Sequence, residues 1–358
     1  MRTDQRLTTL AAALTEWYKS EQRELPFRKT ADPYCIWVSE IMAQQTRITA
    51  LLPYYSRFIE RFPNVYELAK ADEDEVLKLW EGLGYYTRAR NLHKAARQIC
   101  RQFNGQLPGK VKELRGLPGI GTYTAGAIMS IAFNQPVPAV DGNVLRVFAR
   151  LLHITEEITD TYVHARVTDE ASKLLAVGEP HLLAQAIMEL GALVCIPGTP
   201  RCGECQIRKM CMAHAAGEQQ NVPVLPVRAE KVVVHRAVLL LHCKEKILVR
   251  KRTERLLHNL WEFPGIDVSH EETEEAVVEW LEMNAVKNNT FTEVGRARHV
   301  FTHRIWEMAG FRIDVDNEID IESAVWVDRS RLRELAFPKA LHKYYEIIIE
   351  DANTAGQV

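Results

Sequence analysis

The sequence predicts a two-domain protein in which an all-α domain, residues 1–215, precedes a mixed α+β domain, residues 229–358. Up to about residue 215, apolar side chains recur three and four positions apart, which is the spacing of amphipathic helices. Beyond residue 229, runs of valine, isoleucine and leucine indicate strands. Residues 216–228 separate the two patterns. Their end, NVPVLPVR, carries two prolines and no helical period, so we interpret this stretch as a linker.

The helical domain carries recognisable start signals as well as apolar periodicity. Helix starts are indicated by Asp32-Pro33 and by the acidic turn at 72–74. A short helix is expected over 110–115, and a longer one over 122–133. The clearest apolar periods lie at 7–18, 36–48, 76–79, 128–131 and 144–151.

The second domain combines strands with helices, which is typical of α+β architecture. An acid-flanked segment at 271–283 predicts one helix, and residues 329–350 return to a helical pattern. The candidate strands are 231–241, 246–252, 311–316 and 324–328.

Composition and charge limit the function classes. The chain is 47% hydrophobic and 26% charged, as in ordinary globular proteins, and its net charge is −2. Because no overall positive field exists, any polyanionic partner must be bound by a local patch. The longest apolar run, 237–241, is far too short to span a membrane, and the N-terminus lacks the apolar core of a signal peptide. We therefore expect a cytoplasmic protein.

The stretch LPGIG at 117–121 joins two predicted helices. Its two glycines allow positive φ and the close approach of another backbone. The second helix begins directly afterwards, so its free N–H groups and positive dipole end are available to an anion such as a phosphate. Thr122 and Thr124 add hydroxyl donors. A plain connection between two helices accounts for the turn equally well.

Four of the seven cysteines are crowded into seventeen residues. In a reducing compartment such a cluster indicates a metal site before it indicates disulfides. Thiolates bind zinc or iron–sulfur centres, and a zinc ribbon normally has two C-x-x-C knuckles, whereas only one occurs here. Nearby basic side chains at 201, 208 and 209 suit either DNA phosphates or a solvated surface. The clustered residues are Cys195, Cys202, Cys205 and Cys211.

Two carboxyl groups are candidates for catalysis. Glu40 lies on a mostly apolar helix beside Trp37 and Ile41, where burial would raise its pKa and suit a general acid. The alternative is a side chain that points to water. Asp141 precedes the apolar period at 144–151, where aspartate is a favoured helix N-cap and remains ionised.

Taken together, these motifs resemble the MutY-type adenine DNA glycosylases of the helix-hairpin-helix DNA glycosylase superfamily, over nearly the whole chain. The resemblance rests on WVSEIMAQQT, LPGIGTYTA, VDGNV, the spacing C-x6-C-x2-C-x5-C and LWEFPG, in this order along the sequence. It implies a six-helix part at about 26–134 and an iron–sulfur part formed by 1–25 and 135–215. It also implies that the four cysteines hold a structural 4Fe–4S cluster.

The resemblance assigns roles to the carboxyl groups. Glu40 would protonate adenine at N7, and Asp141 would stabilise the oxocarbenium ion or attack its C1′, with Asn143 orienting Asp141. At the position of Tyr123, the endonuclease III branch has a lysine that forms a Schiff base and cleaves the strand. Tyrosine has no amine, which implies base excision without efficient strand cleavage. A nearby lysine at 110 or 112 leaves room for residual lyase activity.

Other family positions imply contacts to DNA. Gln45 and Tyr85 would fill the base stack, Arg28 would line the base pocket, and Gln185 would face the flipped base. Phe27 departs from the LPWR that is usual before this arginine. Glu189 is expected to be structural. The hairpin residues that would hold the phosphate are Leu117, Gly119, Gly121 and Thr122.

LWEFPG resembles the opening of a Nudix hydrolase domain. Counted from Gly265, Glu271 fits the magnesium-binding pattern of that family, but the later acids fall on 279–280 and 283–284, where tryptophan and methionine stand. Because Mg²⁺ requires oxygen ligands, we expect the fold without the hydrolysis. HVFTHRIW resembles the family loop that recognises 8-oxoguanine. Its residues are Phe301, Thr302 and His303, and threonine replaces the common serine.

The leading hypothesis is a monomeric, monofunctional adenine glycosylase that acts on adenine opposite 8-oxoguanine or guanine in duplex DNA, in the nucleoid. One alternative is an endonuclease III-like glycosylase and lyase, which Tyr123 argues against. Another is a non-catalytic reader of DNA structure, which is hard to reconcile with the retention of Glu40 and Asp141. A nucleotide pyrophosphohydrolase is opposed by the missing acids.

Overall fold

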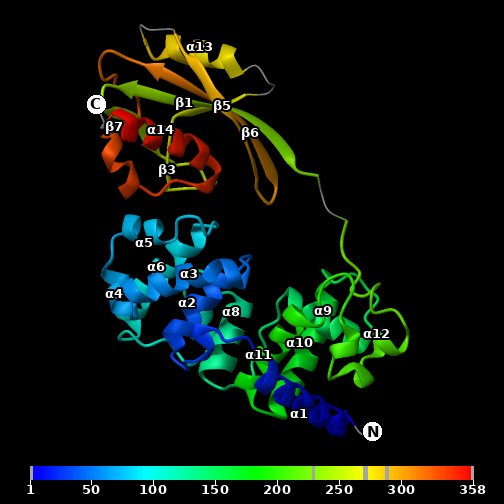
Figure 1. The fold of residues 1–358 in the computed structure, drawn as a ribbon. Helices are drawn as coiled ribbons and strands as arrows, with labels where there is room; N and C mark the ends of the chain where they lie inside the picture. The colour runs from blue at the N-terminus through cyan, green and yellow to red at the C-terminus, as the bar shows by residue number, and fades with distance from the viewer. Residues whose placement is uncertain (1–2, 228–229, 269–272, 287–289, 356–358) are drawn as a thin grey trace. The chain divides into compact units, whose positions relative to one another are not determined.

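The computed structural model of the chain divides into two compact units (Figure 1). The first unit comprises Met1–Lys70 and Asn91–Arg228, and the second comprises Ala71–Arg90 and Ala229–Val358. The short segment 71–90, assigned to the helical domain from sequence, therefore groups with the second unit. Among the described helices, none combines the length and the apolar character needed to cross a membrane. The described residues are 3–227, 230–268, 273–286 and 290–355.

The first unit is built from helices, which confirms the predicted all-α class. Helical turns Pro26–Arg28, Cys202–Glu204 and Arg208–Met210 supplement the helices. The α-helices are α1 Thr3–Glu21, α2 Pro33–Ala43, α3 Ile48–Arg61, α4 Val65–Lys70, α6 Thr87–Gln102, which begins in the second unit, α7 Val111–Arg115, α8 Thr122–Ala127, α9 Gly142–Leu152, α10 Thr161–Ala176, α11 Pro180–Leu193 and α12 Met212–Ala215.

Two helices that matter for the site differ from the prediction. The helix expected over 36–48 ends at Ala43, and the chain turns through Gln45, whose φ is 56°, before α3 begins. The helix expected over 122–133 is α8 followed by the π-helical turn Ile128–Ala132. Single π-helical turns are often associated with functional sites. The apolar period continued through both places, so periodicity alone gave no sign of the change.

Helix starts are fixed by local side-chain chemistry. Asp32 caps α2 by accepting a hydrogen bond from the Tyr34 amide at 2.9 Å, which confirms the start predicted there. Asp141 caps α9 in the same way, accepting from the Val144 amide at 2.8 Å. Such caps stabilise a helix by about 1 kcal/mol because they satisfy an otherwise unbonded N–H group.

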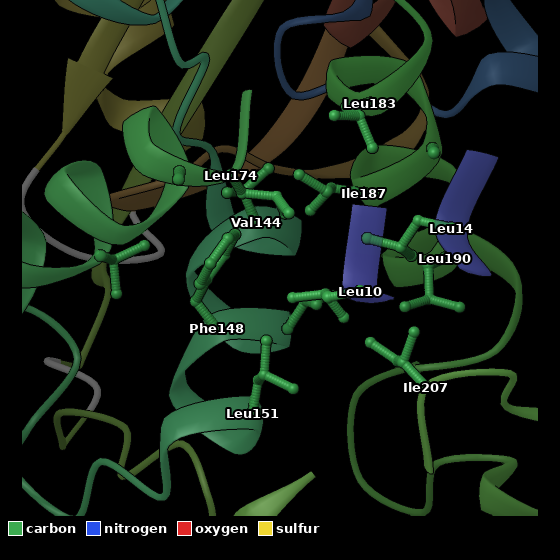
Figure 2. Close-up of a cluster of buried hydrophobic side chains, with 14 of the residues drawn as sticks. Leu10, Leu14, Val144, Phe148, Leu151, Leu174, Leu183, Ile187, Leu190 and Ile207 are labelled. Atoms are coloured by element: carbon green, nitrogen blue, oxygen red, sulfur yellow. The ribbon is translucent and has the colours of Figure 1, made fainter. Parts of the chain in front are cut away.

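One apolar core joins α1, α9, α10 and α11 of the first unit. Figure 2 shows its side chains directed toward one another from separate helices. Burial of each large aliphatic side chain contributes about 1.5–3 kcal/mol, so this core fixes the positions of α9 and α11 relative to each other. The labelled members are Leu10, Leu14, Val144, Phe148, Leu151, Leu174, Leu183, Ile187, Leu190 and Ile207.

The second unit contains a mixed seven-stranded sheet in the order β3-β2-β1-β6-β5, with β4 paired to β1 and β7 paired to β2. β1 and β6 run parallel, and the other pairs are antiparallel. The strands are β1 Val232–Cys243, β2 Lys246–Lys251, β3 Trp261–Glu262, β4 Gly265–Val268, β5 Thr292–Val300, β6 Arg304–Asp314 and β7 Ala324–Asp328.

Most predicted strands of the second unit are confirmed, and three strands were not predicted. The segment 311–316 is the end of the longer β6, while β3, β4 and β5 had no strong β-branched run. The residues 329–350, predicted as helix, form two 3₁₀ segments, Arg329–Glu334 and Lys339–Leu341, before the α-helix. Glu271, which fitted the magnesium-binding pattern, lies outside the described residues.

Helices cover both faces of the sheet. α13 (Thr273–Met283) packs on one face through Val277 and Leu281, and α14 (His342–Ala355) packs on the other through Tyr344 and Ile348 (Figure 1). Alternate residues of β1 serve the two cores, as the two-residue period of a strand requires. The unit also contains α5, Glu73–Leu79.

Candidate active site

Four helices of the first unit converge on a cavity of about 370 Å³. Glu40 reaches it from α2, Tyr123 from α8, Asp141 and Asn143 from the start of α9, and Gln185 from α11. Arg28 lines the same cavity, so the structure brings together six predicted site residues that span more than 150 positions of sequence.

Glu40 has an environment that favours its protonated form. Burial raises the pKa of Glu40 to about 7, the charge of Asp141 acts in the same direction, and a hydrogen bond from Tyr123 partly opposes them. That hydrogen bond joins the Tyr123 hydroxyl to Glu40 Oε2 at 2.9 Å. Burial also raises the pKa of Tyr123 well above its usual value, so the phenol remains a donor. At neutral pH the Glu40 carboxyl is therefore poised between its two protonation states.

Asp141 sits in a more strongly hydrogen-bonded environment. Its Oδ1 accepts from the Val144 amide at 2.8 Å, and its Oδ2 accepts from Asn143 Nδ2 at 2.9 Å. Burial raises the pKa of Asp141, and these donors oppose the rise by stabilising the anion. The two carboxyl groups that face this cavity therefore lie in different environments. Such a difference allows one group to act as the acid while the other remains an anion.

Arg146 connects this cavity to the cysteine loop. Its Nη2 donates to Asn143 Oδ1 at 2.8 Å, and its Nε donates to the Cys195 carbonyl at 2.8 Å. Because the amide oxygen of Asn143 faces the guanidinium, its nitrogen is directed at Asp141. Sequence reasoning missed Arg146. Its position one turn after Asn143 on α9 was the available signal.

A buried ion cluster forms one wall of the cavity. Glu189 is 0% exposed and accepts from Arg28 Nη1 at 2.8 Å and from Arg23 Nη2 at 2.6 Å. Burial alone would raise the pKa of Glu189, but hydrogen bonds from Arg28 and then Arg23 lower it to about 2. Arg28 was predicted for this pocket and lines it; Arg23, which also lines it, was missed.

We expect Glu189→Ala to lower the free energy of unfolding by about 3 kcal/mol at pH 7, because Arg28, 10% exposed, and the partly exposed Arg23 lose their buried partner. Urea denaturation measures the effect. The Glu189 pKa lies below its ordinary 4.5, so its contribution is full above pH 4.5 and is lost as the pH falls toward 2. Glu24→Ala, which removes an exposed pair with Lys29, serves as the control and should cost less than about 1 kcal/mol. Equal effects of the two substitutions would contradict the prediction.

The hairpin at 117–121 has the geometry of a tight backbone turn. Leu117 is buried, and Gly119 has a φ of 78° with a hypothetical Cβ only 2.8 Å from the Asn91 Cβ, so only glycine fits. Gly121 does not need this freedom: its φ is −85° and it caps α8 with extended backbone. Thr122 is exposed at the first turn of α8. The expectation of positive φ thus holds for one glycine of the two.

The remaining predicted DNA contacts lie outside the cavity. Gln45 is exposed beyond the end of α2, and Tyr85, 48% exposed with a φ of 49°, belongs to the second unit. In that unit the Tyr85 hydroxyl lies 2.9 Å from the Thr302 hydroxyl. Phe301 is half-buried, while Thr302 and His303 are exposed in the loop between β5 and β6.

The four clustered cysteines line one cavity together with Arg150. All four thiols are free; Arg150 Nη1 donates to Cys195 Sγ at 3.3 Å, and Cys211 Sγ donates to the Arg150 carbonyl at 3.3 Å. Across the described residues, no three histidine, cysteine or acidic side chains are arranged to hold a single metal ion. A cluster of several atoms separates its ligands more widely than one ion does, so four thiols around one cavity with a cationic donor fit an iron–sulfur cluster.

Comparison with known proteins identifies both parts of the chain. Residues 38–173 match the HhH-GPD superfamily base excision DNA repair protein family, and residues 236–346 match the NUDIX domain. The adenine DNA glycosylase of Buchnera aphidicola subsp. Baizongia pistaciae is 32% identical over 83% of this chain and 84% of its own length. A solved thermostable thymine-DNA glycosylase is 26% identical with a TM-score of 0.55, covering 60% of this chain and 100% of that one.

The adenine DNA glycosylase of Rattus norvegicus is 40% identical over 62% of this chain, which spans only 44% of that relative's length. The helical unit therefore belongs to the base excision DNA repair class, and in this chain it is joined to a NUDIX domain. Within that class, the chain belongs to the adenine DNA glycosylase family. The resemblance stated from sequence is thereby confirmed.

Proposed function

We propose that this chain is a monofunctional DNA glycosylase that hydrolyses the N-glycosidic bond of adenine mispaired with 8-oxoguanine, and also with guanine, in duplex DNA. The observation that carries the proposal is that Glu40 and Asp141 face one cavity in which the described lining residues include no lysine. A Schiff base needs an amine, and Tyr123 supplies only a phenol. The name of the relatives, adenine DNA glycosylase, supports adenine as the excised base.

Glu40 acts first, as the general acid. A flipped adenine enters the cavity, and the Glu40 carboxyl gives its proton to N7. The bond between C1′ and N9 then breaks with its electron pair passing to the base, which leaves as neutral adenine. The raised pKa of Glu40 supports this role, because the acid is available near neutral pH.

Asp141 acts on the sugar. Its carboxylate, held by the Val144 amide and by Asn143, stabilises the developing oxocarbenium ion or adds to C1′. Water completes either route, giving a hydroxyl at C1′ and returning a proton to the ionised Glu40. The division of labour parallels that of glycosidases, in which one carboxyl is acid and the other is anion or nucleophile.

The remaining contacts hold the duplex. The hairpin with Gly119, Gly121 and Thr122 grips a backbone phosphate, and Gln45 enters the base stack. Gln185 contacts the flipped base, and Arg28, fixed by Glu189, shapes its pocket. In the second unit, Tyr85 also fills the stack and Thr302 hydrogen-bonds to 8-oxoguanine. The protein acts as a monomer on DNA in the cytoplasm.

A 4Fe–4S cluster held by the four clustered cysteines supports the loop between α11 and α12. When bound, it contributes structural cross-linking of that loop rather than chemistry on the sugar. Arg150, which donates to Cys195 Sγ, complements the negative charge of the thiolates, and Arg146 ties the loop backbone to Asn143.

Release of adenine from a duplex with a single adenine opposite 8-oxoguanine tests the proposed function. We expect free adenine and an abasic strand that remains intact until it is treated with alkali. Borohydride included in the reaction should trap little covalent adduct. Strong trapping would favour the lyase alternative, and no adenine release from any mispair would favour a non-catalytic reader. Hydrolysis of a nucleoside triphosphate with magnesium would support a pyrophosphohydrolase.

Cys202→Ser should remove one cluster ligand and destabilise the loop that it supports. We expect loss of the iron–sulfur absorption band and a fall in the thermal unfolding midpoint of about 4 °C or more, because structural metal sites contribute folding free energy. Absorption spectroscopy, iron analysis and thermal unfolding measure these effects. Cys100→Ser, outside the cluster and half-buried, is the control and should retain iron. Full iron content in Cys202→Ser would contradict the assignment.

A further inference from the structure

The loop between β5 and β6, residues 301–303, is held from one side by the start of β1. Lys231 Nζ donates to the Phe301 carbonyl at 2.8 Å, and the Val232 amide donates to the His303 carbonyl at 3.2 Å. The Phe301 amide donates to the Arg304 carbonyl at 2.9 Å. The two carbonyls on either side of Thr302 are thus fixed by two successive residues of one neighbouring segment.

The Phe301 ring is fixed from beneath. Its centroid lies 4.6 Å from that of His299 and 4.9 Å from that of Trp306, in edge-to-face arrangements. Trp306 is 1% exposed, and the guanidinium groups of Arg236 and Arg252 lie over its ring at 4.9 and 5.4 Å. Buried Glu262 accepts from both arginines. The ring therefore has a rigid support, whereas on the outer side the loop backbone is held by Lys231 at the Phe301 carbonyl and by the Val232 amide at the His303 carbonyl.

Lys231 is one of two lysines of the second unit that donate to a backbone carbonyl without a carboxylate partner among the described residues; the other is Lys343, which donates to the Arg296 carbonyl. Lys246 pairs with Glu318 and Lys251 pairs with Asp74, whereas no carboxylate among the described residues pairs with Lys231. Holding an exposed lysine in one geometry costs side-chain entropy, and a charge-assisted bond to the Phe301 carbonyl offsets that cost. The hydrogen bond from Lys231 thus stabilises the conformation of the loop at 301–303.

We propose that Lys231 is a positioning residue for lesion recognition, which rests on the proposed function. By fixing the Phe301 carbonyl, its ammonium holds the backbone before Thr302, while the Tyr85 hydroxyl lies 2.9 Å from the Thr302 hydroxyl. The resulting position of the Thr302 hydroxyl sets the preference for 8-oxoguanine over guanine opposite adenine. The two bases differ only at their N7 and C8 positions, so discrimination by one hydroxyl depends on its placement to within about 0.5 Å. A loop free to shift would contact both bases alike.

The test compares Lys231→Met, which keeps the length of the apolar stem, with Lys231→Arg, which keeps a cationic donor. Adenine release is measured from A:8-oxoguanine and A:guanine duplexes at subsaturating enzyme. In Lys231→Met we expect the ratio of the two rates to fall by about five- to tenfold, as for loss of one charge-assisted bond. Lys231→Arg should retain most of the ratio. The saturating rate on A:8-oxoguanine should change less than about twofold, since the catalytic cavity is untouched.

Lys246→Met makes the same charge change in the same unit and should leave the ratio unaltered. If the natural protein prefers 8-oxoguanine and Lys231→Met leaves the ratio unchanged, the role of Lys231 is overturned while the proposed function stands. Equal losses on both duplexes with a weaker salt dependence would make Lys231 a phosphate contact and also overturn that role. If the natural protein released adenine equally fast opposite 8-oxoguanine and opposite guanine, both the proposed lesion specificity and the role of Lys231 would be overturned.

Discussion

Asp141→Asn is expected to lower the single-turnover rate of adenine release by about 10³-fold or more, the scale of losing a preorganised charge or a nucleophile. The amide keeps the size of the side chain but brings no negative charge to the sugar as the bond to adenine breaks. Denaturing electrophoresis after alkali, on an A:8-oxoguanine duplex with enzyme in excess, measures the rate.

The substitution separates charge from structure because asparagine caps helices about as well as aspartate. The cap bond to the Val144 amide can therefore persist, and the thermal midpoint should stay close to that of the natural protein. Asp160→Asn is the matched control: it makes the same change at the N-cap of α10, where Asp160 accepts from the Tyr162 amide at 2.8 Å. A loss below tenfold in Asp141→Asn, or an equal loss in Asp160→Asn, would contradict the role of Asp141.

Local chemistry explains which parts of the fold could be predicted. A capping aspartate acts within three residues, so the starts at Asp32 and Asp141 were readable in sequence. The end of α2 at Ala43 was not, because no glycine or proline marks it and the turn rests on Gln45 in the left-handed region. β5 was missed because its alternating exposed and half-buried residues carry no continuous apolar run.

The residues of the site also differ in whether the sequence alone could predict them. Glu40 was singled out because a carboxyl among apolar neighbours is costly to bury, an argument that needs only its own helix. Arg23 and Glu189, by contrast, are 166 residues apart, and periodicity specifies which face of a helix is buried without specifying its partner. The hydrogen bond between Tyr123 and Glu40 spans 83 residues and became visible only in the fold.

Glu40→Gln should lower the rate of adenine release by about 10²–10⁴-fold, the contribution of a positioned general acid. In the natural protein the rate should fall as the pH rises above about 7, because the Glu40 pKa is raised to that value and the acid form is lost. The glutamine variant should have no such limb. Tyr123→Phe should move the limb to higher pH, since the lost hydrogen bond favoured the ionised carboxylate. A natural profile that is flat from pH 6 to pH 9 would contradict this role.

The same raised pKa predicts a cost to folding. A carboxyl that holds its proton more tightly when folded stabilises the fold below its unfolded pKa, 4.5, and that contribution is lost as the pH rises through 7. Above pH 7 the natural protein must keep a buried carboxylate, whereas Glu40→Gln keeps a neutral amide. The inactive variant should therefore be more stable, by up to about 3 kcal/mol at pH 8 in urea denaturation, and equal to the natural protein near pH 4. Equal stability at both pH values would mean that Glu40 is solvated in the folded chain and is not held as an acid.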